Sequence, residues 1–157
     1  MDFKLIKYED IDDDNAFENT DLYGADTSHE VYKNSYLGRK NIYHDHEWMK
    51  YLKNKWHFDY AEGIYYKQKP GQMVAPHVDK HTSFTARCPF DFKSENISRY
   101  IVFLSDWHIG QTWMLGKSSL TNWKKFDVIK FPWYMPHATA NVSTQDRELL
   151  TICAICN

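Results

Sequence analysis

Along the second half of the chain, apolar and polar residues alternate in short runs that are separated by turn-forming residues. A β-strand places successive side chains on opposite faces, so such runs are typical of half-buried strands. Seven segments have this character: Ala61 to Gln68, Met73 to Val78, Arg99 to Leu104, Thr112 to Leu115, Asp127 to Phe131, Thr139 to Val142 and Glu148 to Cys156. Many short strands divided by turn signals predict a mostly β protein, either a sandwich or a barrel.

A helix is predicted just before these strands. Trp48, Met49, Leu52 and Trp56 recur at intervals of three and four residues, which places them on one face of a helix. Asp45 precedes them, and Asp is a favoured N-cap residue. We therefore predict a helix of about ten residues that begins after Asp45.

The residues before this helix show little hydrophobic periodicity. The acidic run from Glu9 to Asp14 is typical of a solvated surface, and residues 15–40, with scattered Asn, Asp, Thr, Ser and Gly, are predicted to be irregular. The length suits one domain of ordinary size. We expect a single domain over residues 1–157, with residues 1–59 as irregular and helical support and residues 60–157 as the β core.

Composition and charge narrow the class of protein. The chain is 43% hydrophobic and 17% aromatic, and no apolar run approaches the roughly 18 residues of a membrane span. The N-terminus lacks the apolar core of a signal peptide, and three cysteines, an odd number, argue against a disulfide framework. We expect a soluble cytoplasmic protein without a membrane partner. A net charge of -2 gives no general electrostatic reason to bind nucleic acid.

One stretch carries candidate metal ligands. His77 and Asp79 lie two residues apart near the end of a predicted strand, so both face the same side. A third ligand from a distant strand would complete a 2-His-1-carboxylate triad, which suits Fe(II) and leaves open positions, and His137 is the candidate. A second such pair, His57 and Asp59, follows the helical pattern instead of a turn and an apolar run.

Four motifs in order resemble a known family. They are Gly71-Gln72 with Pro76-His77-Val78-Asp79, then Phe103-Leu104-Ser105-Asp106, then Gly110-Gln111-Thr112-Trp113, and last His137 with Arg147 ten residues later. From about residue 60 to the end, the chain resembles the Fe(II)/2-oxoglutarate-dependent dioxygenases, in particular their prolyl 4-hydroxylase-like branch. The resemblance implies a double-stranded β-helix, or jelly roll, buttressed by the N-terminal helix. It also implies Fe(II), 2-oxoglutarate as cosubstrate, O2, and release of succinate and CO2.

Arg147 is the candidate anchor of the cosubstrate, at a position where this family usually has Lys. A guanidinium can meet a planar carboxylate with two parallel hydrogen bonds. The family's tyrosine nine residues before the first ligand is Gln68 here, and Leu149 lacks the hydroxyl of the family's Arg-x-Ser branch. Tyr66 and Tyr100 are the candidates for the second contact; the alternative is that they are ordinary core residues.

Several further features have two interpretations each. The segment from Lys80 to Asn96 is long for a strand connection and is a candidate lid. Asn141 either orients the site or merely ends a strand. Cys153 and Cys156 are interpreted as buried reduced thiols, because residues three apart on a strand face opposite sides. Core positions are favoured over substrate-facing ones for three tryptophans: Trp113, Trp123 and Trp133.

The sequence therefore predicts an oxygenase that hydroxylates either a peptide side chain of the prolyl type or a small molecule such as an amino acid. A nucleobase demethylase of the AlkB type is disfavoured, because no second arginine follows Arg147 at that group's spacing. Two alternatives remain open: a jelly-roll binding module without catalysis, and a zinc-dependent hydrolase that uses the same three ligands.

Overall fold

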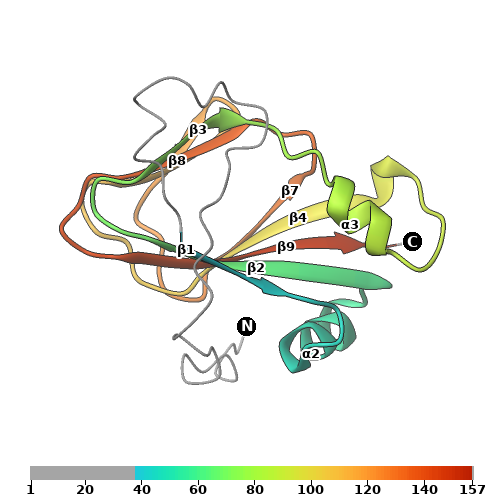
Figure 1. Cartoon of the computed structure of the whole chain (residues 1–157). Helices are drawn as coiled ribbons and strands as arrows, with labels where there is room; N and C mark the ends of the chain where they lie inside the picture. Colours follow the sequence, from blue (N-terminus) through green and yellow to red (C-terminus); the bar gives the residue numbers. More distant parts are fainter. Residues whose placement is uncertain (1–37, 157) are drawn as a thin grey trace.

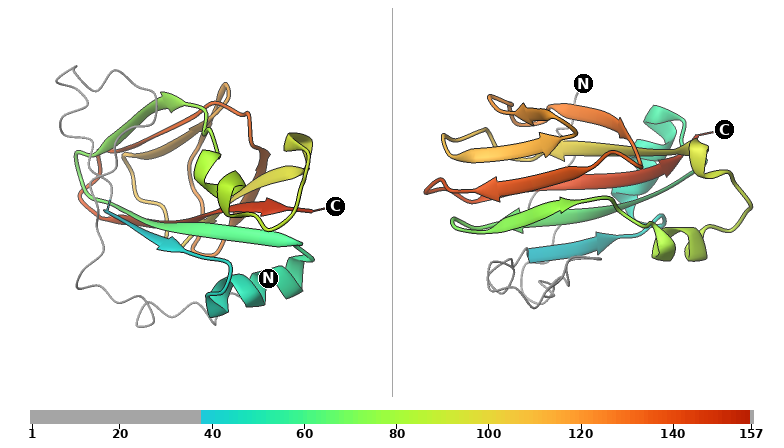
Figure 2. Two further views of the ribbon diagram at one scale, coloured as in Figure 1. Left: turned by 45° about the vertical axis from the view of Figure 1, so that its right-hand side comes forward. Right: turned by 90° about the horizontal axis from the view of Figure 1, so that it is seen from above.

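The computed structural model describes residues 38–156, in which two antiparallel β-sheets face each other (Figures 1 and 2). The larger sheet has the order β1 (Gly38–Ile42), β2 (Tyr60–Gln68), β9 (Arg147–Ile155), β4 (Ile97–Phe103) and β7 (Val128–Pro132). The smaller sheet has the order β3 (Met73–His77), β8 (His137–Asn141), β5 (Gln111–Leu115) and β6 (Ser118–Leu120). This arrangement confirms the predicted mostly β, double-stranded β-helix fold.

All seven predicted strands are present, and the structure adds two that the sequence pattern did not reveal. β1 lies partly within the stretch 15–40 that we predicted to be irregular, and it pairs with β2 from Gly38↔Lys67 to Ile42↔Gly63. Its sequence, GRKNI, is polar because β1 is at the edge of its sheet, so hydrophobic periodicity does not mark it. β6 has three residues, too few to show a period. The acidic run Glu9 to Asp14 and residues 15–37 lie outside the described residues.

The predicted helix is α2 (Glu47–Trp56), and its N-cap is His46 instead of Asp45. The Nδ1 atom of His46 accepts a hydrogen bond from the backbone N–H of Trp48 at 3.2 Å. An imidazole nitrogen can thus satisfy a free N–H of the first turn as a carboxylate would. At the other end, His57 is the C-cap in the left-handed conformation, with φ 57°.

The central strands of the larger sheet are buried on both faces, and β9 shows this most clearly. Leu150, Ile152 and Ala154 pack on the outer face with α2, where Leu52 is fully buried. Leu149, between Arg147 and Thr151, packs on the inner face against a second apolar cluster. Truncation of such a buried leucine costs about 2 to 5 kcal/mol of stability. The inner face of the larger sheet and the smaller sheet thus enclose the interior of the β-helix, where the predicted site residues are expected.

The tryptophans and cysteines occupy the positions expected of core residues. Trp113 and Trp123 are buried in the inner apolar cluster, and Trp133 packs partly buried against a third one. The three cysteines are free thiols. Cys153 is buried on β9 and Cys156, beyond the end of the strand, is partly buried.

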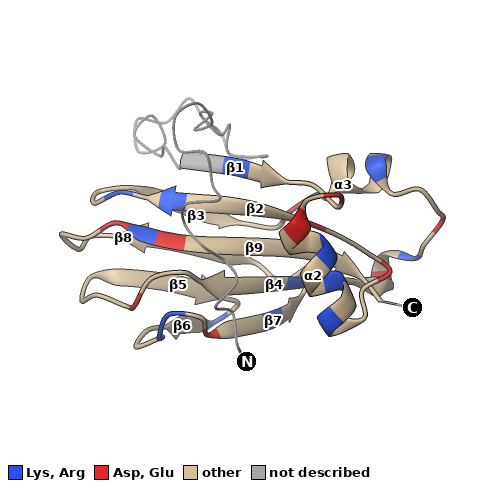
Figure 3. Cartoon of the chain, turned by 90° about the horizontal axis from the view of Figure 1, so that it is seen from below, with Lys and Arg blue, Asp and Glu red and all other residues tan. Residues whose placement is uncertain are grey.

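The connection between β3 and β4 carries structure of its own. It contains α3 (Thr82–Arg87) and a short 3₁₀ helix, η2 (Ser94–Asn96), and Figure 1 shows α3 close to β9 and β2. Figure 3 shows several Lys and Arg positions on α2, with further basic and acidic positions toward the strand ends and in the turns. Among residues 38–156, no helix is both long enough and apolar enough to cross a membrane.

Candidate metal centre

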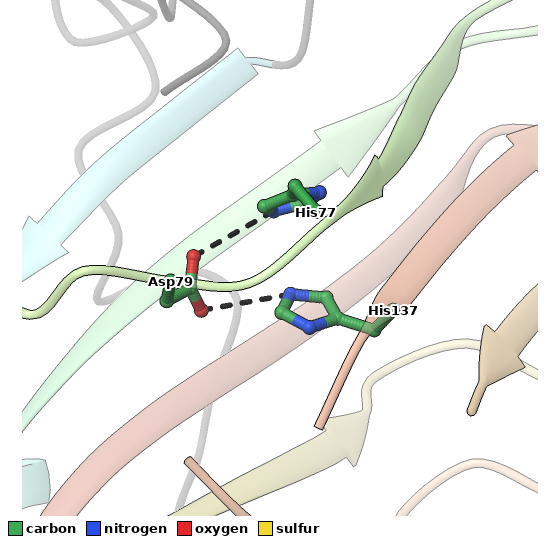
Figure 4. A group of neighbouring side chains, drawn as sticks. All are labelled: His77, Asp79 and His137. Carbon is green, nitrogen blue, oxygen red and sulfur yellow. Dashed lines mark ion pairs between the residues drawn. The ribbon is translucent and has the colours of Figure 1, made fainter. Parts of the chain in front are cut away.

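The pairing of β3 with β8 brings the predicted metal ligands together. His77 is the last residue of β3, His137 is the first of β8, and the two are directly opposite in the register. Asp79 follows two residues after His77, and Figure 4 shows its carboxylate between the two imidazole rings. Its Oδ1 lies 3.6 Å from Nε2 of His77, and its Oδ2 lies 3.5 Å from Nε2 of His137.

A bulge in β3 turns His77 into the interior. Val74 is paired with Thr139, and His77 with His137. The chain therefore advances three residues along β3 between these pairs but only two along β8. Val74 faces the interior because directly opposed residues of an antiparallel pair share a face and Thr139 contacts interior side chains. Without the extra residue, strand alternation would point His77 outward. The bulge therefore makes the triad geometrically possible.

The two imidazole rings are held by backbone carbonyls. Nδ1 of His77 is 2.8 Å from the carbonyl oxygen of Ala75, and Nδ1 of His137 is 3.1 Å from that of Met135. An Nδ1–H that donates to a carbonyl leaves the Nε2 lone pair available for a metal. Burial lowers the pKa of His137, which favours the neutral ligand form.

The ligand atoms of His77, Asp79 and His137 all lie within 4.8 Å of one another, and no other such group of His, Cys, Asp or Glu is found in the described part of the chain. The second His-x-Asp pair has structural roles instead. His57 caps α2, and the backbone N–H of Asp59 donates to the carbonyl of Ile155.

The sequence interpretation missed Arg99, which contacts the triad directly. Its Nη1 lies 2.6 Å from Oδ2 of Asp79, and the residue is buried on the inner face of β4. Burial alone would raise the pKa of Asp79, but Arg99 and the nearby imidazole of His77 hold it well below its usual range. A signal was present in the sequence, because Arg99 takes an inward position in line with Ile97, Ile101 and Phe103.

Arg147 is the largest fully buried side chain, 1% exposed, and it has no carboxylate partner among residues 38–156. Its Nη1 donates to the carbonyl of Thr112 at 2.9 Å, and its Nη2 donates to Oγ1 of Thr139. Its Nε has no hydrogen-bond partner in the described structure. Burial lowers the pKa of Arg147 to about 9. A buried cation without a counter-charge is costly, so this environment suits an anion supplied from outside the chain.

Arg147 and the triad share one interior. Thr139, which contacts Arg147, follows His137 by two residues on β8, a rise of roughly 6.5 Å. Trp113 lies beside both Arg147 and the triad. Its ring stacks on that of His137 with 6.1 Å between centroids, and the guanidinium carbon of Arg147 lies 5.4 Å from the centroid of the Trp113 ring. The separation is comparable to the length of a five-carbon dicarboxylate.

The two candidate tyrosines lie on opposite sides of the large sheet. Tyr66 is on the inner face and packs partly buried against the cluster that contains Trp113 and Leu149. Tyr100 stacks on Trp56 of α2 at 5.3 Å, which places it on the outer face. Strand alternation requires this, because its neighbour Arg99 points inward to Asp79. The structure therefore brings Tyr66, and not Tyr100, to the interior shared with the triad.

Two polar residues near Arg147 organise that end of the β-helix. Gln68, at the position of the family's tyrosine, accepts a hydrogen bond from Thr139 through Oε1 at 3.3 Å. Asn141 is fully buried, and its Nδ2 donates to the carbonyls of Gln68 and Gln145 at 2.9 and 2.8 Å. Asn141 thus fixes the turn that leads into β9 and orients the approach to Arg147.

Comparisons with known proteins show a likeness of fold. Similar structures include the cupin domain of Cnp3 from Schizosaccharomyces pombe, with 10% identity over 76% of this chain and 61% of that chain and a TM-score of 0.49. A Cupin_2 domain of an XRE family transcriptional regulator from Enterobacter cloacae has 13% identity over 77% of this chain and 98% of that chain, with a TM-score of 0.48. A predicted oxalate decarboxylase from Thermotoga maritima has 14% identity over 76% and 81% of the two chains, with a TM-score of 0.45.

No protein family defined by sequence matches this chain, and no curated protein is similar to it in sequence. The structural neighbours are cupin and double-stranded β-helix proteins. The resemblance to the prolyl 4-hydroxylase-like branch stays a prediction from the sequence motifs.

Proposed function

We propose that this chain is an Fe(II)- and 2-oxoglutarate-dependent oxygenase that hydroxylates a small molecule or a peptide side chain. The observation that carries the proposal is Arg147, a buried guanidinium without a carboxylate partner in the described structure, in the same interior as the His/Asp/His group. A dicarboxylate bound to a metal at the triad would supply the missing counter-charge.

The donor set fits Fe(II). Two imidazole nitrogens and one carboxylate oxygen converge from β3, the residues after it, and β8. Two His and one carboxylate on one face leave coordination positions for other ligands, as non-heme Fe(II) oxygenases require. Arg99 neutralises the carboxylate from the other side and fixes its orientation.

The surroundings of Arg147 fit the far carboxylate of 2-oxoglutarate. The Nε–H of the guanidinium has no hydrogen-bond partner among residues 38–156, and the hydroxyl of Thr139 lies beside the guanidinium. Charge-assisted hydrogen bonds of this type are roughly twice as strong as neutral ones. Tyr66 is the inner-face candidate for an additional contact.

When bound, the iron with 2-oxoglutarate and O2 supplies the oxidising power, so that the substrate gains a hydroxyl group while succinate and CO2 are released. The chain itself positions the reactants and excludes water from the site. Trp113 and Phe131 are buried and pack against the ring of His137, which excludes water from that side of the imidazole. Exclusion of water strengthens the electrostatic contacts of Arg147 and suppresses side reactions.

Metal analysis and succinate release test this proposal together. Protein supplied with Fe(II) under anaerobic conditions and then exposed to air with 2-oxoglutarate should form succinate, and a screen of peptides and metabolites should reveal compounds that accelerate it. Protein loaded with Zn(II) and the His137→Ala variant should form none. Hydrolytic activity with Zn(II) and without 2-oxoglutarate would instead identify a hydrolase. Absence of any metal binding would leave a binding module.

A further inference from the structure

A cavity of about 150 Å³ adjoins the proposed metal ligand Asp79. It lies between the inner face of the larger sheet, where Glu62 and Thr151 line it, and the segment from Asp79 to Arg87. Its lining also includes the exposed side chains of Tyr43 and Lys80. The cavity therefore extends from the protein surface to the proposed metal ligand Asp79.

This cavity is separate from the buried surroundings of Arg147, which is not among its lining residues. Both are on the inner face of β9, but the cavity touches Thr151 and Cys153, four and six residues beyond Arg147. At the rise of a β-strand, these positions are roughly 13 and 20 Å from Arg147 along the strand. A ligand in the cavity would approach Asp79 from the side away from Arg147, which leaves the cosubstrate position free.

Arg87 of α3 is held in a fixed orientation at the cavity. Its Nε donates to Oε1 of Glu62 at 2.9 Å and to Oε2 at 3.1 Å, and its Nη2 donates to Oε2 at 2.5 Å. The hydroxyl of Tyr60 donates to the same carboxylate at 2.6 Å. Glu62 thus accepts from two donor residues, whereas Nη1 of Arg87 has no hydrogen-bond partner among residues 38–156 and is available to another acceptor.

The charged side chains of the cavity favour an anion. Lys80, Arg87 and Arg99 are cationic, and only Glu62 and Asp79 are anionic, which leaves a net charge of +1. Lys80 forms no ion pair with any residue in the described range 38–156. A metal at the triad would add further positive charge.

The size of the cavity limits the ligand. A cavity of about 150 Å³ is comparable to one that accommodates a single benzene ring, and it is well below the roughly 300 to 1,000 Å³ of pockets for drug-sized ligands. We infer that this cavity binds the primary substrate, a small carboxylic acid of the size of an amino acid; this inference rests on the proposed function. The carboxylate of this acid binds Arg87 and Lys80, and its body reaches toward Asp79.

Calorimetry with the whole chain tests this inference. Mn(II) replaces Fe(II) to prevent turnover, 2-oxoglutarate is saturating, and the probes are free L-amino acids, their C-terminal amides and capped peptides. At least one free amino acid should bind, with its amide about tenfold to a hundredfold weaker because one charge-assisted contact is lost. Arg87→Met should produce a similar loss for the acid and little change for the amide, while 2-oxoglutarate affinity stays within about twofold.

Lys80→Met provides a second variant, because this exposed residue has no ion pair in the described structure and its loss should leave the fold intact. It should weaken binding of the acid, whereas Lys93→Met, in the same connection but outside the cavity, should not. Equal binding of acids and amides, or tight binding of capped peptides unaffected by Arg87→Met, would overturn the inference while 2-oxoglutarate binding remains normal. Failure of the metal-loaded wild type to bind 2-oxoglutarate would overturn the proposed function itself.

Discussion

Arg99, which is buried, and Asp79, which is partly buried, form an ion pair in which Nη1 of the arginine lies 2.6 Å from Oδ2 of the aspartate. One oxygen of the proposed metal ligand is therefore also held by a cation of the protein. Asp79 has two roles, as a ligand and as the counter-charge of Arg99, and the two roles respond differently to substitution.

The first prediction separates these roles by a double-mutant cycle in metal-free protein. Asp79→Asn should lower the free energy of unfolding by about 2 to 3 kcal/mol, because it leaves a buried guanidinium without its partner. Arg99→Met should also destabilise, and the double variant should be more stable than the sum of the two single losses predicts. Chemical denaturation of the four proteins measures this coupling, and additive losses would show that the pair contributes nothing.

The stability lost in Asp79→Asn should depend on pH, because the pKa of Asp79 is lowered in the folded protein. A carboxyl whose folded-state pKa is depressed contributes stability above its unfolded pKa of about 3.9, and the contribution is lost as the pH falls toward the folded value. The difference in stability between wild type and Asp79→Asn should therefore be full near neutral pH and shrink below about pH 4. A difference that grew on acidification would contradict this assignment.

The second prediction concerns the metal ligands. His77→Ala and His137→Ala should each abolish tight Fe(II) binding, because each removes one of three ligands from one face. Asp59→Ala should leave binding unchanged. For the other control, His57→Asn is preferable to alanine, because His57 caps α2 in the left-handed conformation, which Asn tolerates. Anaerobic metal titration measures the effect, and full binding by His137→Ala would refute the triad.

The third prediction concerns Arg147. The affinity for 2-oxoglutarate should decrease in the order Arg147, Arg147→Lys, Arg147→Leu, with a first step of about tenfold to a hundredfold, because an ammonium cannot make the paired contact of a guanidinium. Fe(II) binding should hardly change.

The stability of the same variants provides an independent check. Arg147 has no carboxylate partner in the described structure, and without it the hydroxyl of Thr139 can still donate to Gln68 or to the carbonyl of Thr112. Ligand-free Arg147→Leu should therefore be within about 1 kcal/mol of wild type. Saturation with 2-oxoglutarate at 100 times its dissociation constant should stabilise metal-loaded wild type by about 2.7 kcal/mol and the variant by much less. Equal stabilisation of both would place the anchor elsewhere.

The fourth prediction compares the two tyrosines. Tyr66→Phe should weaken 2-oxoglutarate binding by about twofold to tenfold, the value of one neutral hydrogen bond. Tyr100→Phe should have no effect on that affinity, since Tyr100 packs between α2 and the outer face of the sheet. Calorimetric titration of both variants with 2-oxoglutarate measures the two affinities. A larger effect at Tyr100 than at Tyr66 would contradict the inner-face assignment.

Much of the fold was predictable because alternation survives wherever one face of a strand is buried. The seven predicted strands carry alternating or continuous apolar runs, as in β4 and β9, whereas β1 is a polar edge strand and β6 has only three residues, so neither leaves a pattern. Helix α2 was predicted from its apolar spacing, but its N-cap was wrong by one residue, because His46 takes the role we gave to Asp45.

The composition of the candidate site was predictable in part. The His77, Asp79 and His137 group follows from motif spacing, yet the β3 bulge that turns His77 inward has no clear sequence signal. Arg99 was overlooked because its partner is distant in the sequence, although its inward position among apolar residues was visible. Tyr100 was a poor candidate by the same logic, since residues next to each other on a strand cannot both face the site.

The most direct test of the central claim is whether metal and 2-oxoglutarate bind to one shared site. Anaerobic calorimetry should compare 2-oxoglutarate binding to wild type with and without Fe(II), and to His137→Ala. The account predicts that Fe(II) tightens binding at least tenfold in wild type, that 2-oxoglutarate tightens Fe(II) binding by the same factor, and that His137→Ala abolishes the enhancement. Equal affinity for 2-oxoglutarate in all three cases would show that Arg147 and the His/Asp/His group do not act together, and it would contradict the account.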